Sequence, residues 1–321
     1  MKKIVAIVAG EPNSINSEII AKVLKLKKKN NKVIFFVIGN FLLLKSQLKQ
    51  INIKIRLNKI NNLSEINENI DINILDIPLI QNSIFSVDKK FTSKYVLLCL
   101  DKANHLALNN KIVGFINCAI DKRKTFNNRF LGVTEYLSKK NKLNKSEVMM
   151  IYNKELSVVP ITTHIKVRNI SKNISKKIII KKLNTLNNYY FKILKKKPII
   201  AVLGLNPHND ENRKNSEERK FIIPAIKACK RKLRIMGPFP ADTIFSTKKK
   251  YNYDVIVGMY HDQVLAPFKA KYGYDAINIT LGLKYIRISP DHGTASDIIG
   301  LNKADPTSLL NCLNFFKDNV R

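Results

Sequence analysis

The sequence predicts an α/β protein with a largely parallel sheet and helices on both of its faces. First, apolar runs of strand length alternate with helical segments along most of the chain. Second, the strand-like runs are apolar almost throughout, which is typical of strands that are buried on both faces. Third, 45% of the 321 residues are hydrophobic, which is enough to bury a sizeable core. We therefore expect two domains, or two lobes that share a core.

The first half of the chain opens on residues 4–9, an uninterrupted apolar run that predicts a buried strand. This start imitates a signal peptide, but Glu11 and Pro12 follow at once, so a strand is the better interpretation. The other elements predicted here are a helix at 17–26, a strand at 33–38, a helix at 95–108 and a strand at 112–119.

The second half begins with two neighbouring strands at 148–152 and 156–160. A long basic helix at 175–194 precedes Lys197-Pro198, so we place an approximate lobe boundary near residue 195 within one catalytic unit of two interleaved lobes. The remaining predicted elements are strands at 199–205 and 255–259 and helices at 217–230 and 306–316. No segment has 18 uncharged apolar residues, so we expect no membrane span.

Net charge is the least ordinary bulk property, because 57 basic minus 24 acidic residues gives +33. Such an excess is typical of proteins that bind nucleic acid or anionic membranes. However, residues 255–300, the part richest in motifs, contain four basic and four acidic residues and are therefore neutral. Over-use of Lys, Asn and Ile also fits a mutational bias toward AT-rich codons. We therefore place the excess on the remaining surface and do not expect a nucleic-acid partner.

The four cysteines lie far apart and form no CxxC pair. Three of them, Cys99, Cys118 and Cys229, lie in apolar or helical contexts. We expect buried free thiols in a reducing compartment, and hence a cytoplasmic protein.

Four of the five histidines lie in polar clusters, and His105, in a helical stretch, is the exception. His164, His208 and His261 each closely follow an apolar strand. Loops beyond the carboxyl ends of parallel strands build active sites, and imidazole there can bind a metal or move protons. A hydrogen-bonded structural histidine is the alternative for each, because no HExxH or CxxC signature supports a metal.

Two charged residues have contexts that indicate a role. Asp242 lies in a proline-rich turn after a strand-like run at 233–236, so it either orients a ligand or caps a helix. Arg287 lies within the apolar string Tyr285-Ile-Arg-Ile288, where a charge must be paired or bind an anion. Lys269 is a further candidate anion ligand. No GxGxxG follows the first strand, so a Rossmann cofactor site is unsupported.

Taken together, the polar strings resemble one family, the 4-hydroxythreonine-4-phosphate dehydrogenases of pyridoxal phosphate biosynthesis. The match runs from residue 4 to about 300 and is most specific over 255–300. The strings that carry it are Gly10-Glu-Pro12 with Glu18, Lys122, Gly132 with Thr134-Glu135, Thr162-Thr-His164, Gly204-Leu-Asn-Pro-His208, Gly237-Pro with Pro240-Ala-Asp-Thr243, Tyr260-His-Asp-Gln263, Asn278-Ile-Thr-Leu-Gly-Leu283 and Asp291-His-Gly-Thr-Ala295.

The resemblance implies an isocitrate/isopropylmalate-dehydrogenase-like fold and a homodimer with a shared active site. It implies NAD or NADP as cofactor and one divalent metal (Zn, Mg, Mn or Co) held by His164, His208 and His261, with His261 from the second chain. The other implied site residues are the catalytic candidates Lys269, Asp242 and Asp262, the substrate contacts Thr134, Lys269, Asn278 and Arg287, and the cofactor contacts His292, Gly293, Thr294, Ala295 and Asn206.

Three departures from the family pattern bear on specificity. Val133 stands where the family usually has His, which removes one hydrogen bond to the substrate. Residues 209–212 read Asn-Asp-Glu-Asn where the family has Ala-Gly-Glu-Gly, and residues 13–17 replace small or rigid residues of the first motif. Glycine permits positive φ, and Asn tolerates it best among the other residues. The alternatives are a dehydrogenase for threonate or erythronate phosphate and a non-catalytic protein that binds anions or nucleic acid.

Overall fold

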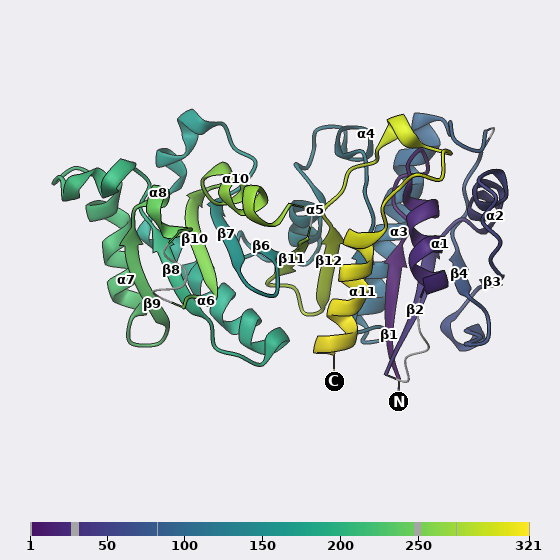
Figure 1. Cartoon of the computed structure of the whole chain (residues 1–321), viewed down its shortest axis with the longest axis horizontal. Helices are drawn as coiled ribbons and strands as arrows, with labels where there is room; N and C mark the ends of the chain where they lie inside the picture. Colours follow the sequence, from purple (N-terminus) through teal and green to yellow (C-terminus); the bar gives the residue numbers. More distant parts are fainter. Residues whose placement is uncertain (1, 27–31, 82, 247–251, 274, 321) are drawn as a thin grey trace. The chain divides into compact units, whose positions relative to one another are not determined.

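The computed structural model describes residues 2–26, 32–81, 83–246, 252–273 and 275–320. The chain forms two compact units (Figure 1). Unit 1 contains the residues up to Leu137 together with those from Lys284 onward, and unit 2 is Ser138–Leu283. The chain thus leaves unit 1, builds unit 2 and returns. Residue 195, where we placed the boundary from sequence, lies inside unit 2, because the basic helix that ends there packs within that unit.

Unit 1 holds a sheet in the order β3-β4-β2-β1-β5-β12, and every pairing in it is parallel. Its strands are β1 (Lys3–Val8), β2 (Val33–Gly39), β3 (Leu57–Ile60), β4 (Ile72–Asp76), β5 (Gly114–Asn117) and β12 (Ile286–Pro290). Its helices are α1 (Asn16–Leu26), α2 (Phe41–Gln50), α3 (Lys89–Leu108), α4 (Lys122–Phe126), α11 (Thr307–Asn319) and, reaching into unit 2, α5 (Val133–Lys140), with the 3-10 turns η1 (Leu63–Glu65) and η6 (Ser296–Ile298).

Helices cover both faces of this sheet, as predicted (Figure 1). The crossovers β1-α1-β2 and β4-α3-β5 run in opposite directions across the strand order. Since such connections are right-handed, α1 and α3 lie on opposite faces. Side-chain caps fix where two of the helices start: Asn40 accepts from the backbone N–H of Leu43 at α2, and Asp88 accepts from that of Lys90 at α3.

Unit 2 holds a mixed sheet in the order β11-β6-β7-β10-β8-β9. The pairs β6–β7 and β6–β11 are antiparallel, and the others are parallel. Its strands are β6 (Val148–Tyr152), β7 (Ser157–Thr162), β8 (Ile199–Leu203), β9 (Arg234–Phe239), β10 (Val255–Tyr260) and β11 (Ile277–Leu281). Its helices are α6 (Lys176–Leu194), α7 (Ile223–Cys229), α8 (Ala241–Ile244) and α10 (His261–Tyr272), with 3-10 turns η2 (Val167–Asn169), η3 (Ser171–Asn173) and η4 (Pro207–Asn212) and a π turn, η5 (Glu218–Ile222).

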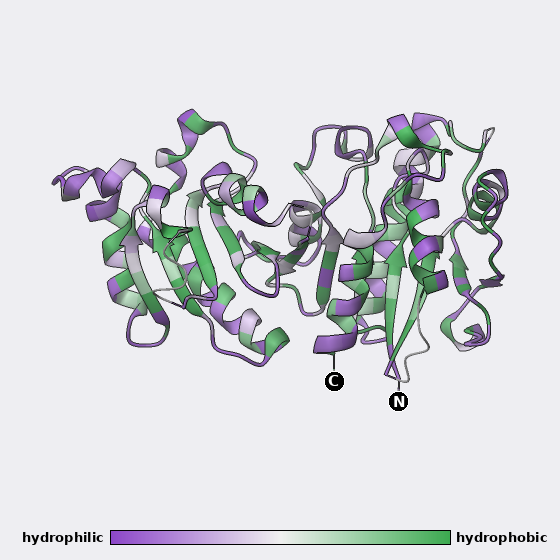
Figure 2. Ribbon diagram, in the orientation of Figure 1, coloured by the Kyte–Doolittle hydropathy of each residue, from purple (hydrophilic) through white to green (hydrophobic). Residues whose placement is uncertain are grey.

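The basic helix α6 shows how the sequence separates core from surface. Its buried residues, spaced three or four apart, are Ile179, Leu183, Leu186, Tyr190 and Ile193. Each such buried side chain contributes roughly 1.5–3 kcal/mol. Lysines of this helix, such as Lys176 and Lys177, are exposed. Figure 2 shows the same division over the chain, with hydrophobic strands and helices that carry hydrophilic residues.

The buried strands and amphipathic helices confirm the predicted α/β class. Helix α3 begins at Lys89, earlier than predicted, and the predicted helix at 217–230 opens with the π turn. Sequence reasoning did not assign α2, β3, β4, β11, β12 or α10. All four cysteines are buried and free. In the part of the chain that the structure describes, no helix is long and apolar enough to cross a membrane.

Candidate active site

Three of the predicted histidines lie at one edge of the sheet in unit 2. His164 follows β7, His208 lies in the turn after β8, and His261 is the first residue of α10, directly after β10. Strand β10 pairs in parallel with both β7 and β8, so the carboxyl ends of these strands share an edge. Ligands of parallel α/β sheets bind at such edges.

The imidazoles of His164 and His261 are close neighbours, with ring centroids 5.8 Å apart. Each imidazole bound to an ion such as Zn²⁺ sits about 2.0–2.1 Å from it through one nitrogen, so two rings at this separation fit on one cation. His261 Nδ1 lies 2.7 Å from Asp262 Oδ1. A carboxylate in that position fixes the tautomer and leaves Nε2 as the ligand atom.

His208 points to a different partner, since its Nε2 lies 3.9 Å from Asp242 Oδ2. Asp242 lies in the first turn of α8, whose N-cap is Pro240. The helix-cap interpretation of Asp242 is therefore wrong, because Pro240 occupies the N-cap position of α8. Among the described residues of one chain, no group of three His, Cys, Asp or Glu side chains could hold a metal ion. One chain thus brings two of the three predicted ligands together.

The turn that carries His208 has an unusual backbone. Residues 208–211 all have positive φ, between 48° and 58°, although none of them is glycine. A left-handed residue with a side chain costs roughly 1–2 kcal/mol, so neighbouring groups must hold the turn. Asn209 Nδ2 donates to the carbonyl of Pro238 over 3.2 Å. A Cβ at Gly204 would lie 2.1 Å from Asn209 Oδ1, so a larger residue there would displace the Asn209 side chain.

Glu218 holds the start of the same turn and was not singled out from sequence. Its side chain is fully buried. One oxygen accepts from the backbone N–H of Leu205 and of Asn206, each over 2.8 Å, and the other accepts from Asn206 Nδ2 over 3.0 Å. Charge-assisted hydrogen bonds of this kind are among the stronger ones in proteins. The side-chain amide of Asn206, a predicted cofactor contact, therefore already donates a hydrogen bond to the Glu218 carboxylate.

Gln263 ties the histidine-bearing segments to each other. Its Oε1 accepts from the backbone N–H of Met259 over 2.7 Å, and its Nε2 donates to the carbonyl of Gly204 over 2.8 Å. The side chain is buried. The amide therefore bridges the ends of β10 and β8. The string Tyr260-His-Asp-Gln263 signalled this residue, but its role needed the structure.

In unit 1, two predicted substrate contacts meet. Arg287 on β12 is 3% exposed, and it donates from Nε to Asn117 Oδ1 over 2.6 Å and from Nη1 to Thr134 Oγ1 over 3.2 Å. Burial lowers the pKa of Arg287 to about 10, so the guanidinium stays charged at neutral pH. Asn117 was not expected in the site. Val133, the unusual neighbour of Thr134, is buried and offers no hydrogen bond.

The other substrate contacts, Lys269 on α10 and Asn278 on β11, belong to unit 2. Lys269 is half-buried. The Oδ1 atom of Asn278 is buried and accepts no hydrogen bond from the described residues. A buried acceptor without a donor is costly, and a bound ligand can supply that donor.

The predicted cofactor loop lies in unit 1. His292 Nδ1 lies 2.9 Å from the carbonyl of Gly293, so Nδ1 carries the proton. His292 Nε2 is then an acceptor, and it is buried without a partner among the described residues. Burial lowers the pKa of His292, which keeps the ring neutral. The backbone carbonyl of Thr294 accepts from the backbone N–H of Ile15 over 3.2 Å, and Ala295 has a φ of 46°.

A family model described as pyridoxal phosphate biosynthetic protein PdxA matches residues 31–316. The chain belongs to this family. The 4-hydroxythreonine-4-phosphate dehydrogenase of Aquifex aeolicus is 35% identical, over 99% of this chain and 98% of that one. The D-threonate 4-phosphate dehydrogenase of Salmonella typhimurium is 33% identical, over 96% of each chain. A crystal structure of the Klebsiella pneumoniae 4-hydroxythreonine-4-phosphate dehydrogenase gives a TM-score of 0.85 at 30% identity, over 98% of both chains.

These PdxA-family relatives confirm the resemblance seen in the motifs and the prediction of an oxidoreductase. The Klebsiella fold also agrees with the α/β class. Membership of a dehydrogenase family implies a nicotinamide cofactor. The individual site residues stay predictions.

Proposed function

We propose that this chain is a metal-dependent, NAD(P)-linked 4-hydroxythreonine-4-phosphate dehydrogenase. It oxidises the C3 alcohol of 4-phosphohydroxy-L-threonine to a ketone, and the resulting 3-oxo acid loses CO2 to give 3-amino-2-oxopropyl phosphate. The observation that carries the proposal is the His164–His261 pair at the sheet edge of unit 2. Full-length similarity to enzymes with this name supports the reaction.

The metal site is assigned to His164, His208 and His261 in a homodimer with a shared active site. The resemblance implied that His261 comes from the second chain, but His261 lies beside His164 in one chain, so we assign these two ligands to the same chain. The ion that these residues would hold, whether Zn, Mg, Mn or Co, would supply Lewis-acid polarisation of the substrate hydroxyl and would lower its pKa. Asp262 orients the His261 ring for this role, 2.7 Å from its Nδ1. The close His164–His261 pair supplies two imidazoles, which fits such an ion.

The substrate is held by charge and by one buried acceptor. Lys269 and Arg287 anchor its phosphate and carboxylate, since both cations bind such anions. Asn278 Oδ1 accepts from a substrate N–H or O–H, which satisfies that buried oxygen. Thr134 supports the Arg287 guanidinium, 3.2 Å from Nη1. Lys269, Asp242 and Asp262 are the candidates for proton transfer at the alcohol.

The cofactor is assigned to the loop His292–Ala295 with Asn206. NAD or NADP bound there would supply the hydride acceptor for the oxidation at C3. His292 offers its unprotonated Nε2 as a hydrogen-bond acceptor toward the cofactor. The proposal includes a cytoplasmic enzyme, for which the four buried free thiols are suited.

A second candidate keeps the chemistry and changes the substrate to a phosphorylated sugar acid such as threonate or erythronate phosphate. Buried Val133, which stands where the family usually has His, favours it, as does the similarity to the Salmonella D-threonate 4-phosphate dehydrogenase. The two substrates differ in a C2 amine against a C2 hydroxyl.

The test is direct. The purified protein is incubated with a divalent metal, NAD⁺ or NADP⁺ and each candidate phosphate, and the absorbance of the reduced nicotinamide is followed. We expect turnover with 4-phosphohydroxy-L-threonine. Turnover with threonate 4-phosphate alone would replace the first proposal by the second. Turnover with neither, together with salt-sensitive RNA binding, would favour the non-catalytic alternative.

A further inference from the structure

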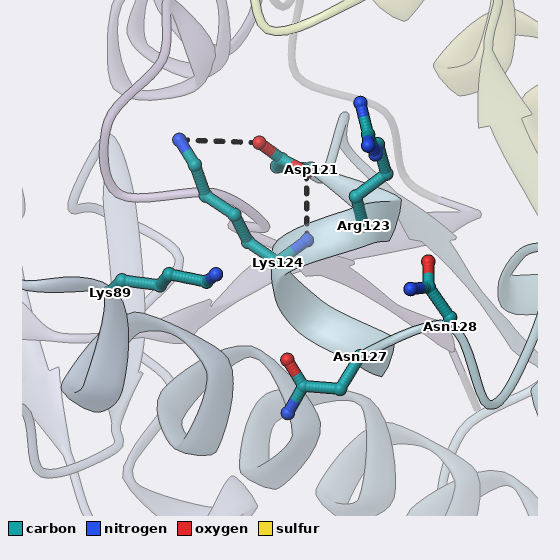
Figure 3. A pocket seen from close by; sticks show the side chains of 6 residues that line it. All are labelled: Lys89, Asp121, Arg123, Lys124, Asn127 and Asn128. Atoms are coloured by element: carbon teal, nitrogen blue, oxygen red, sulfur yellow. Dashed lines mark hydrogen bonds and ion pairs between the residues drawn. The ribbon is translucent and has the colours of Figure 1, made fainter.

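Two adjoining hollows lie in unit 1, and none of the described residues that line them is named in the proposed function. They enclose about 410 Å³ and 480 Å³ and share Lys89 and Lys124. The first is lined by Lys89, Asp121, Arg123, Lys124, Asn127 and Asn128 (Figure 3). The second adds Asn13 and the segment that leads into α3. Figure 3 shows Lys89 extending toward the short helix α4 that carries Arg123 and Lys124.

The topology of unit 1 places these hollows where a ligand site is expected. Strands β1 and β5 are parallel neighbours, so the loops that follow them start at the same edge of the sheet. Ligands of parallel sheets bind at this carboxyl edge. Asn13 lies in the first loop and Asp121 in the second. The loops are fastened together, because Ala119 accepts from the backbone N–H of Glu11 over 2.9 Å.

The lining carries positive charge, and two of its cations have no partner among the described residues. Lys89 and Arg123 form no side-chain hydrogen bond or ion pair with the described residues, and Lys124 lies 3.2 Å from Asp121. Both lining carboxylates already cap helices: Asp88 accepts from the backbone N–H of Lys90 over 2.7 Å, and Asp121 from that of Lys124 over 2.9 Å. Lys89, Lys124 and Arg123 outnumber the carboxylates of Asp88 and Asp121, so the lining carries a net positive charge.

We propose that these hollows bind the phosphate group of a small molecule. Lys89, Lys124 and the Arg123 guanidinium supply the charge, and the guanidinium fork matches a phosphate geometrically. The side-chain amides of Asn127 and Asn128 add neutral donors. A volume of a few hundred cubic ångströms suits a small metabolite. The phosphate belongs either to the nucleotide cofactor or to a separate phosphorylated metabolite, and the site does not depend on the dehydrogenase assignment.

The experiment compares two double variants that each remove two positive charges. Lys89→Gln/Arg123→Gln alters the hollows, and Lys176→Gln/Lys177→Gln alters exposed positions on α6 in unit 2. Inorganic phosphate and pyrophosphate are titrated into each full-length protein by calorimetry at constant ionic strength. We expect the first variant to weaken binding at least about tenfold, since it removes two charge-assisted contacts, and the second to change it less than about twofold. All four positions are exposed, so both variants should melt at the wild-type temperature.

Further titrations with NAD⁺, NADP⁺ and 4-phosphohydroxy-L-threonine separate the sources of the phosphate. Parallel loss of NAD⁺ or NADP⁺ affinity in the first variant would assign the phosphate to the cofactor. Loss confined to inorganic phosphate and pyrophosphate would assign it to another metabolite. Equal loss in both variants, or a wild-type protein that binds neither anion, would overturn the proposal. These titrations measure binding and need no enzyme turnover. A failure of the proposed dehydrogenase function would appear in the turnover assay, so it can be distinguished from a failure of the phosphate proposal.

Discussion

Unit 2 carries imidazoles at the edge of its sheet, whereas unit 1 carries cations at its edge. In unit 2, buried Glu218 and Gln263 hold the segments around the histidines through hydrogen bonds of 2.7–3.0 Å. In unit 1, Arg287 is buried beside Asn117 and Thr134, and Lys89 and Arg123 are exposed.

The difference indicates that the two units bind different parts of the reacting complex. Groups that must hold a metal ion in fixed geometry need rigid support, because a small displacement of a ligand weakens coordination. Groups that bind phosphate or carboxylate act mainly through charge, which tolerates more movement. We therefore expect unit 2 to hold the metal and Arg287 of unit 1 to bind an anionic group of the substrate, with Lys269 of unit 2 as the second anion ligand.

The largest effect is expected for His261→Ala, which should abolish both bound divalent metal and turnover. The loss should exceed the roughly 10–100-fold effect that is typical of residues supporting a ligand. Metal content by mass spectrometry and formation of reduced nicotinamide measure it. His105→Ala, at the exposed histidine of α3, is the matched control and should retain both. Full metal occupancy in His261→Ala would refute the metal assignment.

A second prediction concerns the anion role of unit 1. Arg287→Met should raise the KM for the phosphorylated substrate roughly 10- to 100-fold, because a hydrogen bond to a charged group is worth about 1.5–3 kcal/mol. Bound metal should stay at the wild-type level. Steady-state kinetics and metal content together check this, with exposed Arg129→Met as the control. A lower melting temperature with unchanged KM would make Arg287 purely structural.

The fold was predictable wherever apolar runs were long, as at β1, β10 and α6. Region 40–95 was not, because α2 and the short strands β3 and β4 have weak periodicity and gain their stability from neighbouring strands. The lobe boundary was misplaced because β12 returns to unit 1 from the far end of the chain. Contacts between segments distant in sequence carry no local signal.

Prediction of the site residues from sequence had the same limit. Motifs identified His164, His208 and His261, and the structure brought His164 beside His261. Motifs gave no reason to expect that Asn117 contacts Arg287 or that Glu218 holds the turn before His208, because these pairs depend on tertiary packing. The left-handed turn at 208–211 was anticipated only in part, through the observation that Asn209 replaces a small residue.

A third prediction tests the rigidity of unit 2. Gln263→Leu leaves the backbone N–H of Met259 and the carbonyl of Gly204 buried without partners, which should destabilise the fold by about 1–3 kcal/mol. Metal affinity should fall as well, since the segments around His208 and His261 lose their bridge. Denaturant unfolding and metal titration measure the two effects. Gln263→Glu, which keeps the acceptor and loses the donor, should show an intermediate loss, and wild-type metal affinity in both variants would contradict a positioning role.

The smallest effect is expected at Glu11, which is 3% exposed at the unit 1 edge and has an Oε1 atom without a partner among the described residues. Burial raises the pKa of this carboxyl above its ordinary value of 4.5. The folded state then binds more protons than the unfolded state above pH 4.5, so stability falls as pH rises through that range. Glu11→Gln should therefore raise the melting temperature at pH 7 and should lose this advantage below pH 4.5. Glu68→Gln, whose side chain is 49% exposed, is the control and should not be stabilising at pH 7. If Glu11→Gln is instead less stable than wild type at pH 7, the folded protein stabilises the charged Glu11 carboxylate. That result would indicate that this edge of unit 1 binds cations rather than anions.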